Sequence, residues 1–166
     1  MLSVGQQVVY GIHGVCKIAG TEERTVDRKK VEYYVIEPVS QPGACFYVPT
    51  GNPVAVAKLR PILTADELES LFTDLTDWQK IWVQEENQRK QYYRELISGG
   101  DRKALVSMIL ALQAHRISQQ EAGRKFHLCD ENFLRDAQRL LCMEIAVVLQ
   151  TDESGALSYL KEHIEK

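Results

Sequence analysis

The stretch Asp77–Leu96, DWQKIWVQEENQRKQYYREL, is the part of the sequence around which the rest of the chain is best interpreted. It contains both tryptophans of the chain, Trp78 and Trp82, which stand four residues apart and share one face of a helix. Every residue from 84 to 91 is polar, so a helix here has no apolar stripe to bury. This pattern predicts a long helix over about 77–97 whose first turns project from a compact body. An exposed indole on such a helix favours a docking partner, because it is a large apolar surface.

Length and composition indicate a globular protein without a membrane span. The chain has 166 residues, 45% of them hydrophobic, which is enough for one sizeable core or two small ones. Its N-terminus has no basic region followed by a long apolar run, and no segment approaches the roughly 20 apolar residues of a membrane helix. We therefore expect a cytoplasmic protein.

The cysteines and histidines form no recognisable catalytic or metal-binding pattern. Cys16, Cys45, Cys129 and Cys142 have apolar neighbours and no CxxC spacing, so we expect reduced core thiols. A reactive thiol needs a base and an electropositive, exposed setting, and zinc needs three or four ligands, which His13 with Cys16 and His127 with Cys129 do not supply. We expect no enzyme activity, no metal and no cofactor.

Charge is distributed unevenly along the chain. The net charge is -3, yet residues 78–139 carry a surplus of three basic side chains, while residues 64–77 carry five acidic side chains and no basic one. Nucleic-acid contact by the basic segment should therefore be weak alone and sensitive to salt.

The N-terminal part reads as short strands separated by turn residues. Segments rich in β-branched and aromatic residues alternate with Gly, Asp and Pro between residues 4 and 58, and nothing helical competes. Five strands in so few residues bury a core only if the sheet curls, so we predict a small SH3- or Tudor-like barrel over residues 1–62. The expected core residues are Val8, Val15, Ile18, Val35, Phe46, Val48 and Val56. Residues 59–63 are predicted to form a linker.

The chain becomes helical after the linker. Thr64 and Glu67 form a capping box, Gly100 is suited to ending the tryptophan-bearing helix, and Asp101 and Asp130 are suited to capping later helices. We predict helices ending near residues 116 and 149, a polar connection over 117–128, and a last helix over 153–164. The predicted class is α+β with two domains, the barrel followed by an all-α bundle of about five helices over residues 63–166.

The order of these parts resembles a known family. The opening VxYxxHG pattern (residues 8–14), the FYVP strand (46–49) and the HLxDExFLxxAxxLL run (127–141) resemble CarD-like (CdnL) bacterial transcription regulators. The N-terminal domain of that family is shared with the transcription-repair coupling factor. The resemblance implies a monomeric, non-enzymatic factor that binds the RNA polymerase β subunit with its barrel and promoter DNA with its helices. It also implies a tryptophan wedge in the minor groove at the upstream edge of the bubble, and hence a nucleoid-associated location in the cytoplasm.

The resemblance implies candidate residues for both partners. We assign the wedge to Trp82 and expect Trp78, which continues the stripe of Leu71 and Leu75, to be packed; alternatively, both indoles are core. The expected phosphate contacts are the basic residues near them, each of which is otherwise a solvated surface charge: Lys80, Arg89, Lys90, Arg94, Arg102, Lys103, Arg124 and Lys125. The expected polymerase contacts lie on an exposed edge strand: Arg24, Tyr47, Val48 and Pro49.

A second hypothesis remains open at this point. The weak net charge is also compatible with a protein-interaction module whose helical domain binds a protein partner and not DNA.

Overall fold

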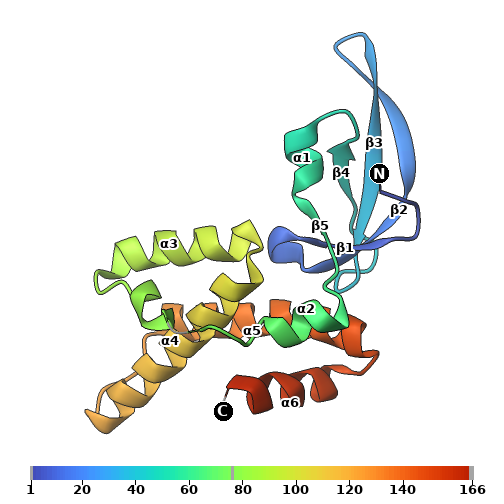
Figure 1. The fold of residues 1–166 in the computed structure, drawn as a ribbon. Coiled ribbons are helices and arrows are strands. Elements are labelled where there is room, and N and C mark those ends of the chain that lie inside the picture. Colours follow the sequence, from blue (N-terminus) through green and yellow to red (C-terminus); the bar gives the residue numbers. More distant parts are fainter. Residues whose placement is uncertain (1, 76, 165–166) are drawn as a thin grey trace. The chain divides into compact units, whose positions relative to one another are not determined.

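Strands and helices are segregated along the chain, as Figure 1 shows. The computed structural model describes residues 2–75 and 77–164, and it divides into two units, Met1–Ile62 and Leu63–Lys166. The first unit contains the five strands and the second contains α2 to α6. The predicted α+β class is therefore confirmed, with the sheet preceding the helices.

The first unit is built on one antiparallel sheet. Its strands are β1 (Gln7–Tyr10), β2 (Val15–Val26), β3 (Lys29–Pro38), β4 (Phe46–Pro49) and β5 (Leu59–Pro61), in the order β4-β3-β2-β1-β5. Among the residues that the structure describes, β4 and β5 are the two edge strands and do not pair with each other. The predicted closed barrel is therefore not confirmed. The sheet is nevertheless strongly bent, because the Tyr10 ring at the end of β1 lies 6.0 Å from the Phe46 ring on β4.

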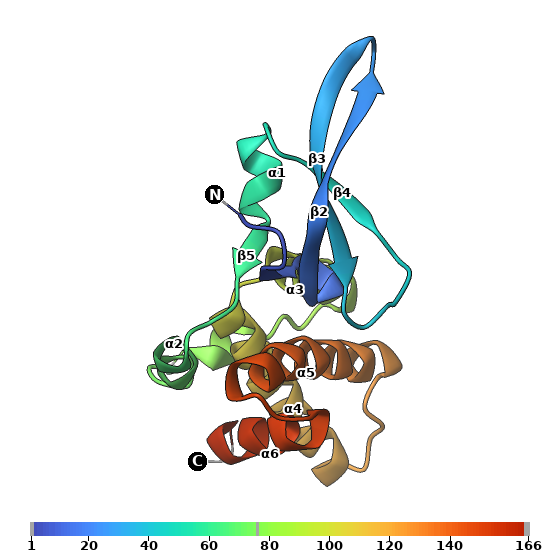
Figure 2. The same cartoon turned by 90° about the vertical axis from the view of Figure 1, so that its right-hand side faces the viewer.

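The β2–β3 hairpin continues beyond the other strands, as Figure 2 shows. Its tip is a two-residue turn in which Asp27 and Arg28 have φ angles of 50° and 65°, as a type I′ hairpin turn requires. All residues from 21 to 30 are exposed, so this arm contributes little to the core.

The segment PVAVAKL at residues 53–59 has the composition predicted for a strand, but most of it is a helix. Residues 53–57 form α1 (Pro53–Ala57), because the Asn52 side chain accepts hydrogen bonds from the backbone N–H groups of Val54 and Ala55. Pro53 stands in the first turn, where its missing N–H costs nothing. The fifth strand is instead Leu59–Pro61, which pairs with β1 inside the segment predicted as a linker.

The predicted core of the sheet is largely correct. Val8, Val15, Ile18 and Val48 are buried, and Phe46 and Val56 are partly buried and pack against the core. Val35 is half-buried, and its neighbour Ile36 takes the core position, because successive strand residues face opposite sides.

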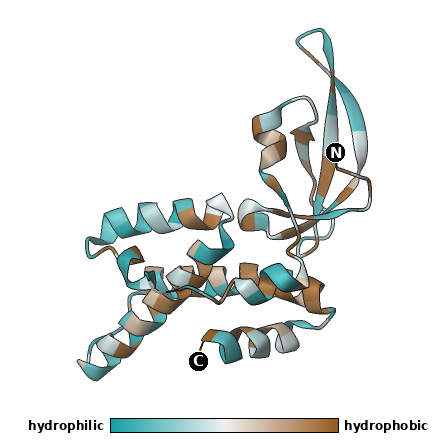
Figure 3. Ribbon diagram, viewed as in Figure 1, coloured by the Kyte–Doolittle hydropathy of each residue, from teal (hydrophilic) through white to brown (hydrophobic). Residues whose placement is uncertain are grey.

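The second unit consists of five α-helices and a short 3-10 helix, within the part of the chain that the structure describes. They are α2 (Ala65–Ser70), η2 (Trp78–Ile81), α3 (Glu86–Gly99), α4 (Arg102–Glu121), α5 (Leu128–Leu149) and α6 (Glu153–Ile164). The Thr64 capping box and the Asp101 cap are confirmed, and Gly100 ends α3 at φ 71°. Helix α4 is longer than predicted, so the connection to α5 is shorter. Apolar faces of α4, α5 and α6 form the core, and Figure 3 shows the first half of α3 as hydrophilic.

A buried carboxylate ties the start of this unit to its core. Glu144 on α5 is 2% exposed, and it accepts hydrogen bonds from Arg102 on α4 and from the backbone N–H of Leu63. The shorter contact to Arg102 is 2.9 Å. Arg102 was predicted to contact DNA, but its guanidinium is held in this ion pair and we assign it a structural role.

The cysteine prediction holds in part. Cys16 and Cys142 are buried, and burial raises the pKa of each thiol to about 11, which makes both poor nucleophiles. Cys45, predicted to be a core thiol, is exposed, and Cys129 is partly exposed. All four are free thiols.

Within residues 2–75 and 77–164, no helix is both long enough and apolar enough to cross a membrane.

The Glu144 cluster generates a stability prediction. Glu144→Gln should lower the free energy of unfolding of the helical unit by about 3 kcal/mol, because the Arg102 guanidinium loses its counter-charge. Urea unfolding followed by tryptophan fluorescence measures this, since both tryptophans lie in the helical unit. Glu162→Gln on the exposed surface of α6 is the matched control. Equal unfolding midpoints for the two variants would contradict the assigned role.

Candidate functional site

The edge strand β4 presents backbone groups on the side away from β3. The backbone N–H of Thr50 donates to the carbonyl of Glu32 at 3.0 Å, which fixes the hydrogen-bonded positions of this ladder. Antiparallel pairs alternate between bonded and non-bonded, so Tyr47, opposite Val35, is at a non-bonded position. Its backbone N–H and C=O therefore face the free edge, where another strand can pair with them.

A basic and aromatic surface flanks this edge. The guanidinium carbon of Arg24 lies 3.9 Å from the centre of the Tyr47 ring, and Tyr33 packs edge-on against the same ring at 6.4 Å. Arg24 also pairs with Glu22 at 3.2 Å. Tyr47 is 38% exposed, so the structure brings together two of the predicted polymerase contacts at an accessible position.

The other two predicted polymerase contacts have structural roles. Val48 is 2% exposed and belongs to the core of the sheet. Pro49 is half-buried, and its carbonyl accepts a hydrogen bond from the backbone N–H of Asn52. The Val48 side chain is therefore unavailable to a partner, whereas a contact through the half-buried Pro49 ring stays a prediction. The accessible part of the strand is centred on Tyr47.

The predicted long tryptophan-bearing helix is wrong. Trp78 lies in the short helix η2, and Trp82 after it has an extended backbone with φ -69° and ψ 127°. Helix α3 starts only at Glu86, because the Glu85 carboxylate accepts hydrogen bonds from the backbone N–H groups of Asn87 and Gln88. This cap separates the tryptophans from the polar helix, so no indole is carried on a projecting stalk.

Trp82 is packed on three sides by polar or charged groups. Its ring stacks on His115 of α4 with 3.9 Å between ring centres, and the Arg89 guanidinium lies 4.6 Å from it. Its indole N–H donates to the side-chain oxygen of Gln84 at 3.1 Å. Trp82 is therefore half-buried against the helical core.

The two tryptophans line one shallow pocket. Its volume is about 220 Å³, and its other walls are Gln79, Ala111, Ala114 and His115. Trp78 is half-buried as well. The indoles are thus neither projecting nor fully enclosed, and they meet in a concave aromatic site.

A buried ion pair holds this arrangement in place. Arg89 on α3 and Asp130 on α5 form two hydrogen bonds of 2.9 Å each, at 4% and 0% side-chain exposure. The same guanidinium donates to the backbone carbonyls of Val83 and Gln84. Arg89 was predicted to contact DNA and Asp130 to cap α5, and both predictions are replaced by this structural pairing.

The remaining predicted phosphate contacts lie at the surface of the helical unit. Lys80 forms an exposed ion pair with Asp77, and the partly exposed Lys90 pairs with Glu86. Surface pairs of this kind are weak, so both ammonium groups can exchange partners. Arg94 on α3 and Lys103 on α4 are exposed. Arg124 and Lys125 lie elsewhere, in a separate cleft.

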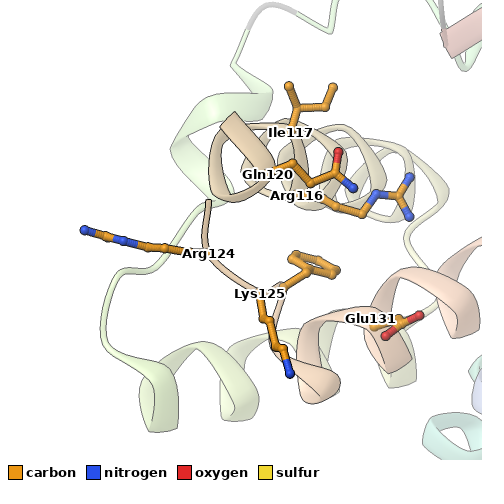
Figure 4. A pocket seen from close by; sticks show the side chains of 7 residues that line it. Arg116, Ile117, Gln120, Arg124, Lys125 and Glu131 are labelled. Carbon is orange, nitrogen blue, oxygen red and sulfur yellow. The ribbon is translucent and has the colours of Figure 1, made fainter. Parts of the chain in front are cut away.

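That cleft lies at the connection between α4 and α5 and has a volume of about 630 Å³. Figure 4 shows its labelled side chains, with Arg124 extending away from the others. Helix α4 contributes Arg116, Ile117 and Gln120 to its lining. The connection contributes Arg124, Lys125 and Phe126, and the first turn of α5 contributes Glu131. The cleft therefore contains three cations, one carboxylate and two apolar side chains.

Sequence reasoning missed His115, Arg116 and Phe126. His115 and Arg116 stand at the predicted end of a helix that continues to Glu121. No local pattern links His115 to Trp82 or Phe126, and these contacts arise from the packing of α4 beside η2 and the connection.

The first unit matches a known family. Residues 2–63 match the family model described as the CarD-like/TRCF RID domain. The resemblance that the VxYxxHG and FYVP patterns indicated is thus confirmed for this unit. The helical run at residues 127–141 lies outside the matched range, so what it implies stays a prediction.

The setting of His115 predicts a pH effect. Burial lowers the pKa of His115, with Asp130 acting to raise it and Arg89 and His127 to lower it. The unfolded chain therefore binds this proton at higher pH than the folded protein. Stability should fall as the pH drops below the ordinary histidine pKa of about 6.5.

His115→Gln removes this titration, so the variant should lose less stability than the wild type between neutral pH and about pH 5.5. Urea midpoints from tryptophan fluorescence measure the difference. His13→Gln, in the other unit, is the control and should keep the wild-type slope. If the urea midpoint of His115→Gln fell as steeply with pH as that of the wild type, burial of the His115 imidazole would not be the cause of the pH effect.

Proposed function

Because the first unit is a CarD-like/TRCF RID domain, a type of domain that binds the RNA polymerase β subunit, we propose that this protein is a transcription regulator. It binds that subunit through Met1–Ile62 and binds promoter DNA at the upstream edge of the bubble through Leu63–Lys166. Its effect is to stabilise the open complex. The observation that carries the proposal is the RID match on a unit with an accessible edge strand.

Strand addition is the mode of polymerase binding that the edge supports. The outward N–H and C=O of Tyr47 can pair with a strand of the partner and extend the sheet. Arg24 and the Tyr47 ring then lie beside the added strand, where a cation and an aromatic side chain can contact its residues. The footprint is short, because the Pro49 carbonyl is already bonded.

The aromatic pocket is the part of the helical unit that we assign to the melted edge of the promoter. Base stacking on exposed aromatic rings is favourable for any sequence, and the half-buried Trp78 offers such a ring beside Lys80. The Trp82 ring is already packed against His115 and Arg89, so it serves as a wall of the pocket. The hypothesis of a projecting Trp82 wedge is replaced by contact through this half-exposed site. Lys80, Lys90, Arg94 and Lys103 are the cations proposed to contact phosphates.

Such contacts favour the open complex only through differential affinity. A ligand that binds melted DNA better than duplex shifts the population towards the melted form. A coupling of about 1–3 kcal/mol would change the open-to-closed ratio by about 5- to 150-fold. Anchoring on the polymerase makes a weak DNA contact sufficient, because it raises the effective concentration of the helical unit at the promoter.

A protein-binding role for the helical unit is the second candidate. Ile117 and Leu128 are 55% and 71% exposed, and apolar side chains of this kind contribute little to phosphate contacts.

The edge geometry gives a test of polymerase binding. Tyr47→Pro removes the outward N–H and should be tolerated, since that N–H does not bond β3 and proline occurs on edge strands. Tyr47→Ala keeps the N–H and removes only the ring. Calorimetric titration of each full-length variant with the β subunit should show that Pro weakens binding at least about tenfold, and more than Ala does. Equal affinities for the two variants would contradict strand addition at this edge.

A further inference from the structure

The cleft between α4 and α5 is chemically unlike the tryptophan pocket. Arg116, Arg124 and Lys125 line it without an ion pair from any of these side chains to a described residue. Several other cations of the chain, such as Arg24, Lys80 and Arg89, are paired. Arg116 and Lys125 give the cleft a positive potential, to which Arg124 adds at longer range because its side chain extends away from the others.

The cleft also contains apolar surface. Phe126 lines it, and Ile117 at its wall is 55% exposed. A phosphate backbone gains nothing from these groups, because phosphates are bound by N–H and O–H donors. Glu131 adds a carboxylate that repels a continuous row of phosphates. A ligand with spaced acidic groups and apolar groups between them complements the cleft better.

The cleft and the pocket occupy different faces of α4. At 100° per residue, the pocket residues Ala111, Ala114 and His115 point to one side of the helix, whereas Arg116, Ile117 and Gln120 point to the other. A partner in the cleft would therefore leave the tryptophan pocket accessible.

We propose that this cleft binds an acidic peptide segment of a protein partner, with carboxylates paired to Arg116 and Lys125 and an apolar side chain against Ile117 and Phe126. This interaction is additional to the proposed contacts with the β subunit and with DNA, and it reassigns Arg124 and Lys125 from DNA to protein binding.

The test uses the full-length protein and three labelled probes, measured by fluorescence anisotropy at fixed salt. The probes are a short peptide alternating Asp or Glu with Leu, an oligoglutamate of equal charge, and a DNA duplex. The acidic, leucine-containing peptide should bind more tightly than oligoglutamate. Lys125→Glu should weaken it about tenfold or more, because attraction becomes repulsion at that position.

Two further variants separate this claim from general electrostatics. Ile117→Ser should weaken the leucine-containing peptide and leave oligoglutamate unaffected, since it removes apolar contact alone. Lys161→Glu, an equal charge change on the exposed face of α6, should leave peptide binding unchanged.

Equal binding of the two peptides would overturn the proposal, and so would equal losses from Lys125→Glu and Lys161→Glu. Loss of duplex binding alone in Lys125→Glu would also overturn it. The last result would show that the cleft binds DNA. Self-association of the chain that Lys125→Glu abolishes, with no peptide binding, would instead make a second copy the occupant. None of these results bears on binding of the β subunit, which is measured separately through Tyr47.

Discussion

The two hydrogen bonds between Arg89 and Asp130 are the constraint on which the helical unit depends. They join α3 to α5 where both side chains are almost fully buried, and a buried charge that lost its partner would cost several kcal/mol. The same guanidinium holds two backbone carbonyls of the segment after Trp82 and faces the Trp82 ring. One side chain thus fixes two helices and the aromatic pocket together, so the shape of that pocket is a consequence of core electrostatics.

The two units present different chemistry to their surroundings. The first offers a strand edge, whose recognition depends on backbone groups and tolerates varied side chains. The second offers an aromatic pocket on one face of α4 and a basic, partly apolar cleft on another. With a net charge of -3, neither surface is suited to strong nonspecific DNA binding. Under the proposed function, binding to polymerase would raise the effective concentration of the helical unit at the promoter, so that weak contacts with DNA would be enough.

Local signals predicted local structure well, and failures occurred where distant contacts decided the outcome. The Thr64 capping box, the Gly100 helix end and the core positions Val8, Val15 and Ile18 follow from neighbouring residues. Asn52 and Pro53 are a helix-start signal for α1, but the β-branched Val54 and Val56 that follow favour a strand. Arg89 and Arg102 look like surface cations in sequence, because their partners Asp130 and Glu144 lie some forty residues away. No local pattern indicates the cleft, because Ile117 and Gln120 belong to the extra length of α4 and Arg124 and Lys125 to the connection after it.

The lifetime of the open complex on a promoter fragment, after challenge with a competitor for free polymerase, tests the central claim most directly. The account predicts that the wild-type protein lengthens this lifetime at least about fivefold, equivalent to about 1 kcal/mol of coupling. Tyr47→Pro leaves the helical unit unchanged and, on this account, weakens binding to the polymerase β subunit. It should therefore restore the lifetime measured without protein. A lifetime that the wild type leaves unchanged, or that Tyr47→Pro lengthens equally, would contradict the account.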